Sequence, residues 1–240
     1  RLNEGSNFDQ VVGGELKHGV LTEETIRYRV DSYGKILKLD RSAIVNDDLQ
    51  ILTQLPQLIA RSAARKVSDV VYDVLTDADG FFSLAHKNLL TEATSALSFS
   101  SLADAVKLLR LQKDADGLPL DIVPKVLLVP PSLEATARAL LASQELNQTG
   151  DLAPTGNPLS SLNLVLEVEP RLEDDSSTAW YLFGGPMDQP MIASFLNGQE
   201  APTIETADPG PEFLGLAWRG YIDFGAALGD YRAAVKATGV

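Results

Sequence analysis

Cysteine is absent from the 240-residue chain, which excludes disulfides, thiolate metal sites and thiol nucleophiles. Histidine is scarce: only His18 and His86 are present, and no carboxylates stand at spacings that would complete a zinc site. His86, in the segment L-A-H-K-N, is interpreted as a surface or loop histidine rather than a general base. No run of about 18 apolar residues occurs, and no secretory signal pattern is found. We therefore expect no cofactor, no metal and no membrane partner.

The common catalytic and phosphate-binding motifs are also missing. There is no G-x-S-x-G, no G-x-x-x-x-G-K-[ST] and no G-x-G-x-x-G. Carboxylates cluster at Glu167, at Glu169 and over 173–175, but they indicate a solvated acidic edge rather than two facing glycosidase carboxylates. D-A-D-G occurs at 77–80 and 114–117 without the other ligands of a calcium loop, so both copies predict turns. No catalytic residue is assigned.

Charge is plentiful but unevenly spread. The net charge is −13, which argues against a general nucleic-acid binder. Residues 27–66 carry eight basic and four acidic side chains, a balance of +4 that leaves −17 for the rest. A basic segment and an acidic body suggest attraction between copies of one chain, with ordinary solvated faces as the alternative. The candidate inter-subunit contact residues are Arg27, Arg29, Lys35, Lys38 and Arg41.

The clearest element is a helix over 56–76. Apolar residues recur at helical spacing and predict one buried stripe. Its members are Ile59, Ala63, Val67, Val70, Val71 and Val74. Pro56 suits the first helical position, where its missing N–H costs nothing. Such a long helix needs a sheet or another layer beside it.

The segment before this helix, residues 26–45, predicts a β-hairpin. Two alternating runs flank the turn-like sequence D-S-Y-G at 31–34. An isolated hairpin is marginal in water, so this one is expected to lean on another part of the structure or on another subunit. Asn46 is then expected to cap a short helix, with Asp47 and Asp48 in its first turn.

The remainder of the chain mixes short helices and strands. Ser101 begins a predicted helix that ends near Gln112, and Ser132 caps another through Ser143. Apolar or alternating runs predict strands at 125–129, 162–168, 179–183, 191–196 and 214–224. The order of elements indicates an α+β fold.

Several segments in a fixed order resemble the Mu-like phage major head subunit family, which are tailed-phage major capsid proteins of the Hong Kong 97 type. The segments are D-R-S-A-I-V-N-D-D-L at 40–49, L-P at 55–56, A-A-R-K at 63–66, L-L-V-P-P-S-L-E at 127–134, S-F-L-N-G at 194–198 and D-F-G-A-A-L-G-D-Y-R at 223–232. The resemblance runs from about Leu16 to Gly239, nearly the whole chain, and it includes no catalytic motif.

The resemblance implies the parts of the Hong Kong 97-type capsid fold. Residues 1–25 would be an N-terminal arm laid over neighbouring subunits, and residues 26–46 an extended β-hairpin loop. A peripheral domain would comprise 47–100 and 205–224, including a long spine helix at 56–76. An axial domain would comprise 101–204 and 225–240.

The resemblance also implies function and partners. The chain would be the major head protein of a tailed phage, assembled in the host cytoplasm into pentamers and hexamers that tile an icosahedral shell. Packaged double-stranded DNA would lie inside without sequence reading. A prohead protease or scaffold would act during assembly, with a trimmed N-terminus at Arg1 as one expected result, and a decoration protein is a further partner. Lys35 and Lys38 are candidate donors of a crosslink to an asparagine of a neighbour.

Two other functions are weighed against this one. An encapsulin-like nanocompartment shell shares the fold, although the order of the segments disfavours it. A soluble α+β enzyme that uses carboxylates would need a pocket and the motifs that are missing. The leading expectation is a structural protein and not an enzyme.

Overall fold

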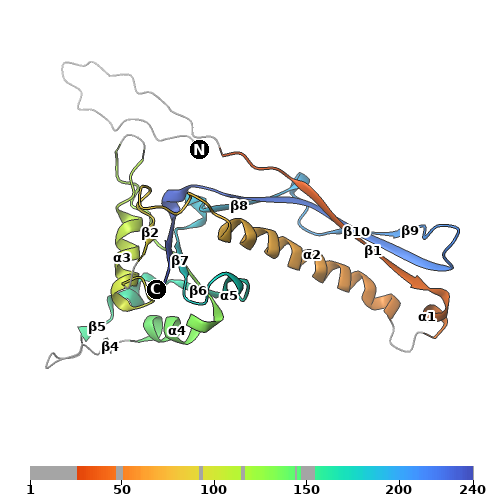
Figure 1. Cartoon of the computed structure of the whole chain (residues 1–240), viewed down its shortest axis with the longest axis horizontal. Coiled ribbons are helices and arrows are strands. Elements are labelled where there is room, and N and C mark those ends of the chain that lie inside the picture. The colour runs from red at the N-terminus through yellow and green to blue at the C-terminus, as the bar shows by residue number, and fades with distance from the viewer. Residues whose placement is uncertain are drawn as a thin grey trace, which may run out of the picture. The chain divides into compact units, whose positions relative to one another are not determined.

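The computed structural model describes residues 26–46, 51–91, 94–114, 117–143, 145–146 and 155–239 (Figure 1). The side chains at 51–53, 145–146 and 155–156 also lie outside the description. The described residues divide into two compact units: those within 26–27, 78–191 and 228–239 form the first, and those within 28–77 and 192–227 form the second. The predicted N-terminal arm at 1–25 lies outside the described residues.

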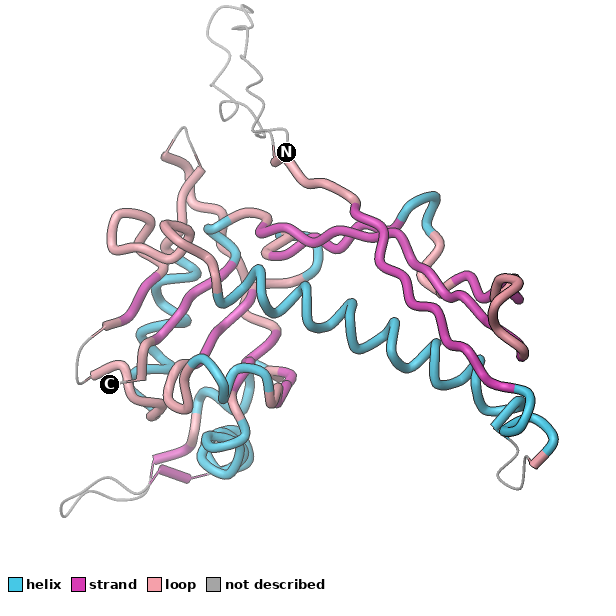
Figure 2. The backbone as a smooth tube through the Cα atoms, turned by 45° about the vertical axis from the view of Figure 1, so that its right-hand side comes forward, coloured by secondary structure: helices cyan, strands magenta, loops and turns pink. Residues whose placement is uncertain are grey.

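The second unit contains the long helix and a four-stranded sheet. Its elements are β1 (Asp31–Asp40), α1 (Arg41–Val45), α2 (Ile51–Thr76), β8 (Met191–Phe195), the 3₁₀ turn η4 (Leu196–Gly198), β9 (Thr203–Ala207) and β10 (Gly215–Leu228). The strand order is β1-β10-β8, and β9 also pairs with β10. Helix α2 runs along β1 and β10, which is the layer that its apolar stripe requires (Figure 2).

Of the predicted stripe of α2, Ile59 is buried and the other five members are half-buried. Leu55 and Leu75, which were not assigned to the stripe, are also buried. The opposing strand contributes buried Ile222 and Phe224. The helix is therefore held by apolar burial, which stabilises by about 1.5–3 kcal/mol per fully buried large side chain.

The predicted hairpin is wrong in its pairing. Asp31–Asp40 is one continuous strand, and it pairs antiparallel with β10 from Asp31 opposite Phe224 to Asp40 opposite Gly215. The residues expected to turn therefore lie inside the ladder, where the Tyr33 and Phe224 rings are 4.7 Å apart. A ten-residue ladder with an aromatic cross-strand pair outcompetes a local hairpin.

Two helix starts also differ from expectation. Asp40 caps α1, because its Oδ1 accepts a hydrogen bond from the Ala43 N–H at 2.8 Å. Asn46 is the C-cap of α1 instead of an N-cap, and Asp47 and Asp48 lie outside the described residues. Helix α2 begins five residues before Pro56, which therefore lies inside the helix. The proline removes one intrahelical hydrogen bond near the helix start.

The first unit is built on a five-stranded sheet in the order β2-β11-β7-β3-β6. Its elements are β2 (Leu89–Leu90), α3 (Phe99–Arg110), β3 (Val126–Val129), η1 (Pro131–Leu133), α4 (Glu134–Ala142), β4 (Glu145–Leu146), β5 (Thr155–Gly156), η2 (Pro158–Leu162), β6 (Val165–Val168), α5 (Arg171–Asp175), β7 (Trp180–Phe183), η3 (Pro186–Asp188), η5 (Tyr231–Ala233) and β11 (Ala234–Ala237). Strands β3 and β6 are parallel, as are β11 and β2, and β4 pairs with β5 separately.

The core of the first unit lies between this sheet and its helices. Trp180, Leu182, Leu127 and Leu102 have no exposed surface, and the Trp180 Nε1–H donates to the Ser95 carbonyl at 2.9 Å. The predicted strands at 125–129 and 179–183 are confirmed. Mixed helix and sheet confirms the α+β class.

The start of α3 corrects a further prediction. Ser98 is the N-cap, three residues before the predicted Ser101. Ser101 instead holds the N3 position of a capping box: the Ser101 N–H donates to Ser98 Oγ at 3.2 Å, and the Ser98 N–H donates to Ser101 Oγ at 2.9 Å. Within the described residues, no helix is both long and apolar enough to cross a membrane.

Candidate assembly surfaces

A groove of about 440 Å³ runs between β1 and α2 in the second unit. Its apolar lining includes Ile59, Ala63 and Ile222, and two lysines, Lys35 of β1 and Lys66 of α2, also line it. The Lys66 Nζ lies 5.5 Å from the centroid of the Tyr33 ring, which also borders the groove. No carboxylate is among the described residues that line it. The groove therefore offers apolar surface together with positive charge.

The predicted basic contact residues do not form one patch. Lys35 lies on the face of β1 toward α2. Lys38, three residues on, lies on the other face because side chains alternate along a strand. The Lys38 Nζ donates to the Pro209 carbonyl at 3.2 Å and lies 5.3 Å from the Phe213 ring centroid. Lys38 therefore contacts the loop at 208–213 within its own chain.

The other three predicted residues have separate positions. Arg41 begins α1, and its N–H donates to the Leu214 carbonyl at 3.0 Å. Arg29 donates from Nε to Asp31 Oδ1 at 2.7 Å, and Arg27 is exposed in the segment before β1. Their role in contacts between subunits stays a prediction.

One lysine of the groove was not predicted as a contact residue. Lys66 follows Ala63 by three positions, so both lie on the same helix face. That spacing is the signal that identifies Lys66, once the helix face toward the sheet is known.

The tip of the second unit exposes apolar side chains. Val45 and Leu214 are 72% and 71% exposed and line a shallow hollow of about 500 Å³ together with Arg41. Exposed apolar clusters of this kind are typical of contact surfaces.

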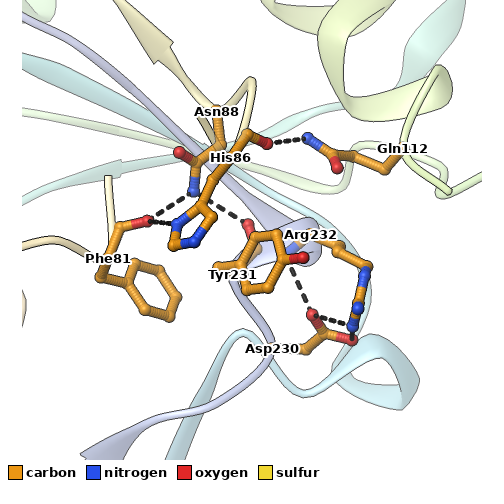
Figure 3. A network of polar contacts seen from close by, with 7 residues as sticks. All are labelled: Phe81, His86, Asn88, Gln112, Asp230, Tyr231 and Arg232. Carbon is orange, nitrogen blue, oxygen red and sulfur yellow. Dashed lines mark hydrogen bonds and ion pairs between the residues drawn. The ribbon is translucent and has the colours of Figure 1, made fainter. Parts of the chain in front are cut away.

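A polar network holds three loops of the first unit together (Figure 3). Asn88 is fully buried, and its Nδ2 donates to the carbonyls of Phe81 and Tyr231 at 3.0 and 3.1 Å. The Gln112 Nε2 donates to the His86 carbonyl at 3.0 Å. Nothing in the local sequence marks Asn88 as buried, because its partner Tyr231 comes from a distant segment of the chain.

The His86 ring is held by a hydrogen bond and by stacking on an aromatic ring. Its Nδ1 lies 3.0 Å from the Phe81 carbonyl, so this nitrogen carries the proton and donates. The imidazole stacks on Tyr231 with ring centroids 4.1 Å apart, and the Arg232 guanidinium lies 4.7 Å from the same tyrosine ring. Asp230 and Arg232, both buried, form an ion pair at 3.2 Å. These contacts give the histidine a packing role in a loop.

The acidic clusters make local structural contacts. Glu169 pairs with Arg171 at 2.6 Å. The carboxylate of Glu173 accepts from the Ser132 N–H at 3.1 Å and from its hydroxyl. Glu167 is exposed on β6. Within the described part of the chain, no group of three or more His, Cys, Asp or Glu is arranged to hold a metal.

One buried group in the sheet of the first unit has a shifted pKa. Burial raises the pKa of Tyr181 well above its usual value, and the nearby Asp175 carboxylate adds to the shift. Its hydroxyl has no hydrogen-bond partner among the described residues. The phenol therefore stays protonated at neutral pH.

Comparison with protein families matches residues 23–237 to a family described as phage capsid protein. No sequence among the curated proteins matches the chain.

Solved structures with the same fold are capsid and shell proteins. The capsid of Myoviridae phage XM1 has a TM-score of 0.63 at 12% identity, covering 100% of this chain and 84% of that one. The head of Helicobacter pylori bacteriophage KHP40 has a TM-score of 0.56 at 10% identity, with coverages of 98% and 82%. The SrpI encapsulin of Synechococcus elongatus has a TM-score of 0.57 at 12% identity, with coverages of 92% and 78%. At these identities the likeness concerns the fold, and it confirms the predicted Hong Kong 97-type architecture.

Proposed function

The chain belongs to the phage capsid protein family, its function is that of a major capsid protein, and from this premise we propose that its copies tile an icosahedral shell around packaged double-stranded DNA. The observation that carries the proposal is the family match over 23–237. We further propose that the chain is a Mu-like major head subunit, for which the order of its sequence segments is the support.

The proposed mechanism is mechanical. Each subunit makes several modest contacts, and closing a pentamer or hexamer makes later contacts intramolecular, so the sum is stable although each contact is weak. The exposed apolar tip around Val45 and Leu214 and the lysine-bearing groove beside α2 are surfaces suited to such contacts.

The proposed domain roles follow the resemblance. The arm at 1–25 and the segment at 26–46 reach over neighbours, residues 47–100 and 205–224 form the peripheral domain, and residues 101–204 and 225–240 form the axial domain. The compact units of the structure divide the chain elsewhere, after residues 77, 191 and 227. The presence of α2 within one compact unit supports a spine role for this helix.

The relation to DNA is containment without sequence reading. A net charge of −13 adds no general affinity for phosphates, so a shell of this chain retains DNA by enclosing it. Assembly in the host cytoplasm with a prohead protease or scaffold, and addition of a decoration protein, belong to the same proposal. Their support is the family resemblance.

A nanocompartment shell is the second candidate, since the SrpI encapsulin shares the fold. Nucleic acid inside the particle separates the two. Particles purified from the natural source should protect long double-stranded DNA from nuclease, with unprotected naked DNA as the control. Particles that enclose a protein cargo and no DNA would overturn the phage-head proposal in favour of the second candidate.

A further inference from the structure

The sheet of the second unit has two open edges. Residues 217–221 of β10 pair with β1 on one side and with β9 on the other, so these two strands lie on opposite sides of β10 (Figure 2). Among the described residues, neither β1 nor β9 pairs with any other strand. Alternate residues of each strand therefore turn their N–H and C=O groups outward, as a template for a further strand.

The groove at the edge of β1 is positive, and the two aspartates of β1, Asp31 and Asp40, lie at the ends of the strand. In this groove Lys35 and Lys66 accompany apolar side chains of α2 and β10. A strand added at this edge would lie over the groove, because β1 itself forms one wall. Its side chains on that face would meet apolar surface and two ammonium groups.

The edge of β9 is negative. Residues 199–212, which include β9, carry four carboxylates and no lysine or arginine. Glu205 is held by Arg219, whose Nε donates to it at 2.8 Å. Glu200 and Asp208, which flank the strand, are exposed. This edge therefore presents backbone groups between two exposed carboxylates, with the Lys38 Nζ of the same chain at the Pro209 carbonyl beside one of them.

We propose that the open edge of β1 in one copy pairs with the open edge of β9 in a neighbouring copy, so that the groove of Lys35 and Lys66 faces one of the two carboxylates that flank β9, Glu200 or Asp208. The two sheets become continuous across the contact. This inference rests on the proposed self-assembly and names one surface of it.

Like-charge repulsion disfavours the two symmetric pairings, β1 with β1 and β9 with β9. Pairing β1 with a second β1 would bring lysines together, and pairing β9 with a second β9 would bring carboxylates together; both repel. The favoured contact uses two different surfaces and is therefore head-to-tail. Contacts of this kind close into rings when the rotation between copies allows it, as pentamers and hexamers require.

Crosslinking of the natural sequence tests the pairing. Particles would be assembled from a mixture of ¹⁵N-labelled and unlabelled protein, checked by electron microscopy, and treated with a carbodiimide that joins lysines directly to carboxylates. We expect peptides of mixed isotope that join Lys35 or Lys66 to Glu200 or Asp208. Mixed-isotope links from these lysines only to other carboxylates, including those of residues 1–25, would overturn the pairing while leaving the shell function intact.

Charge exchange gives a second readout. Lys35→Glu with Lys66→Glu should lower the yield of particles about tenfold, since like charges across an interface suppress association. Adding Glu200→Lys and Asp208→Lys to the same chain should restore it. Arg65→Glu, the same change on the same helix outside the groove, is the matched control. A fourfold variant as poor as the double variant would contradict the pairing. A wild-type chain that forms no particles would count against the proposed function instead.

Discussion

A Cβ atom on Gly220 of β10 would lie 2.2 Å from Cγ2 of Ile59 on α2, so glycine lets the long helix approach its sheet this closely. Ile59 is 4% exposed and Gly220 is also buried, so the contact is central to the packing of the second unit.

Gly220→Ala is therefore expected to destabilise the subunit by about 1–3 kcal/mol, the usual cost of overpacking. Denaturant unfolding of the unassembled protein measures it. Gly185→Ala is the control, because a Cβ there meets its nearest atom at an ordinary 3.5 Å. Ile59→Ala in the Gly220→Ala background should cost less than Ile59→Ala alone, because the methyl group fills part of the space. Equal costs would contradict the contact.

Loss of the Asn88 amide should destabilise the first unit. Asn88→Ala removes the hydrogen bonds that Asn88 donates to the carbonyls of Phe81 and Tyr231 and the one that its Oδ1 accepts from the Ser83 N–H, so it is expected to cost about 2–4 kcal/mol. Unfolding in urea measures the change. Asn88→Asp keeps the shape but not the donor and should be as damaging, whereas Gln199→Ala on the surface should be nearly neutral. A neutral Asn88→Asp would contradict the described network.

The raised pKa of Tyr181 is expected to make the stability of the fold depend on pH in the alkaline range. Its pKa is raised in the folded protein, so the unfolded state loses the phenolic proton first as pH rises above about 10. Stability falls in that range, because deprotonation favours the unfolded chain. Tyr181→Phe should leave the free energy of unfolding at pH 7 unchanged or slightly higher. It should reduce the fall in that free energy between about pH 9 and pH 11, the range in which a free phenol ionises. Identical alkaline profiles for variant and wild type would show that Tyr181 does not contribute.

Assembly should respond to salt through the two groove lysines. The screening length falls from about 10 Å at 0.1 M salt to about 3 Å at 1 M, which weakens the attraction of the groove lysines for carboxylates and also the repulsion between copies that each carry a net charge of −13. Lys35→Gln with Lys66→Gln should assemble more slowly than the wild type at low salt, and the difference between the two rates should shrink toward 1 M, as followed by light scattering. Arg65→Gln should keep the wild-type salt dependence. An unchanged dependence in the lysine double variant would place the charge attraction elsewhere.

The parts of the fold that were predictable are those with a local signal. The stripe through Ile59 identified α2, and the short apolar runs identified β3 and β7, because burial of one face imposes a period on the sequence. The partner of β1 had no such signal. It pairs with residues 215–224, far along the chain, and alternation alone does not say which strand a strand will meet.

The same limit applies to the candidate surfaces. The charge of Lys35 makes it a candidate from the sequence alone. That Lys35 and Lys66 line the same groove depends on how α2 packs on β1. Asn88 resembles an ordinary loop residue until the chain brings the Phe81 and Tyr231 carbonyls to it. The predicted start of α3 was wrong by three residues. Ser98 and Ser101 are both able to cap a helix, and only the folded geometry shows which of them does so.

The most direct test of the central claim is the assembly state of the purified protein, measured by light scattering and negative-stain electron microscopy across a range of salt concentrations. The account predicts closed shells, or sheets and tubes of hexamers, with the lattice of a capsid. A protein that remains a monomer or dimer under every condition would contradict it.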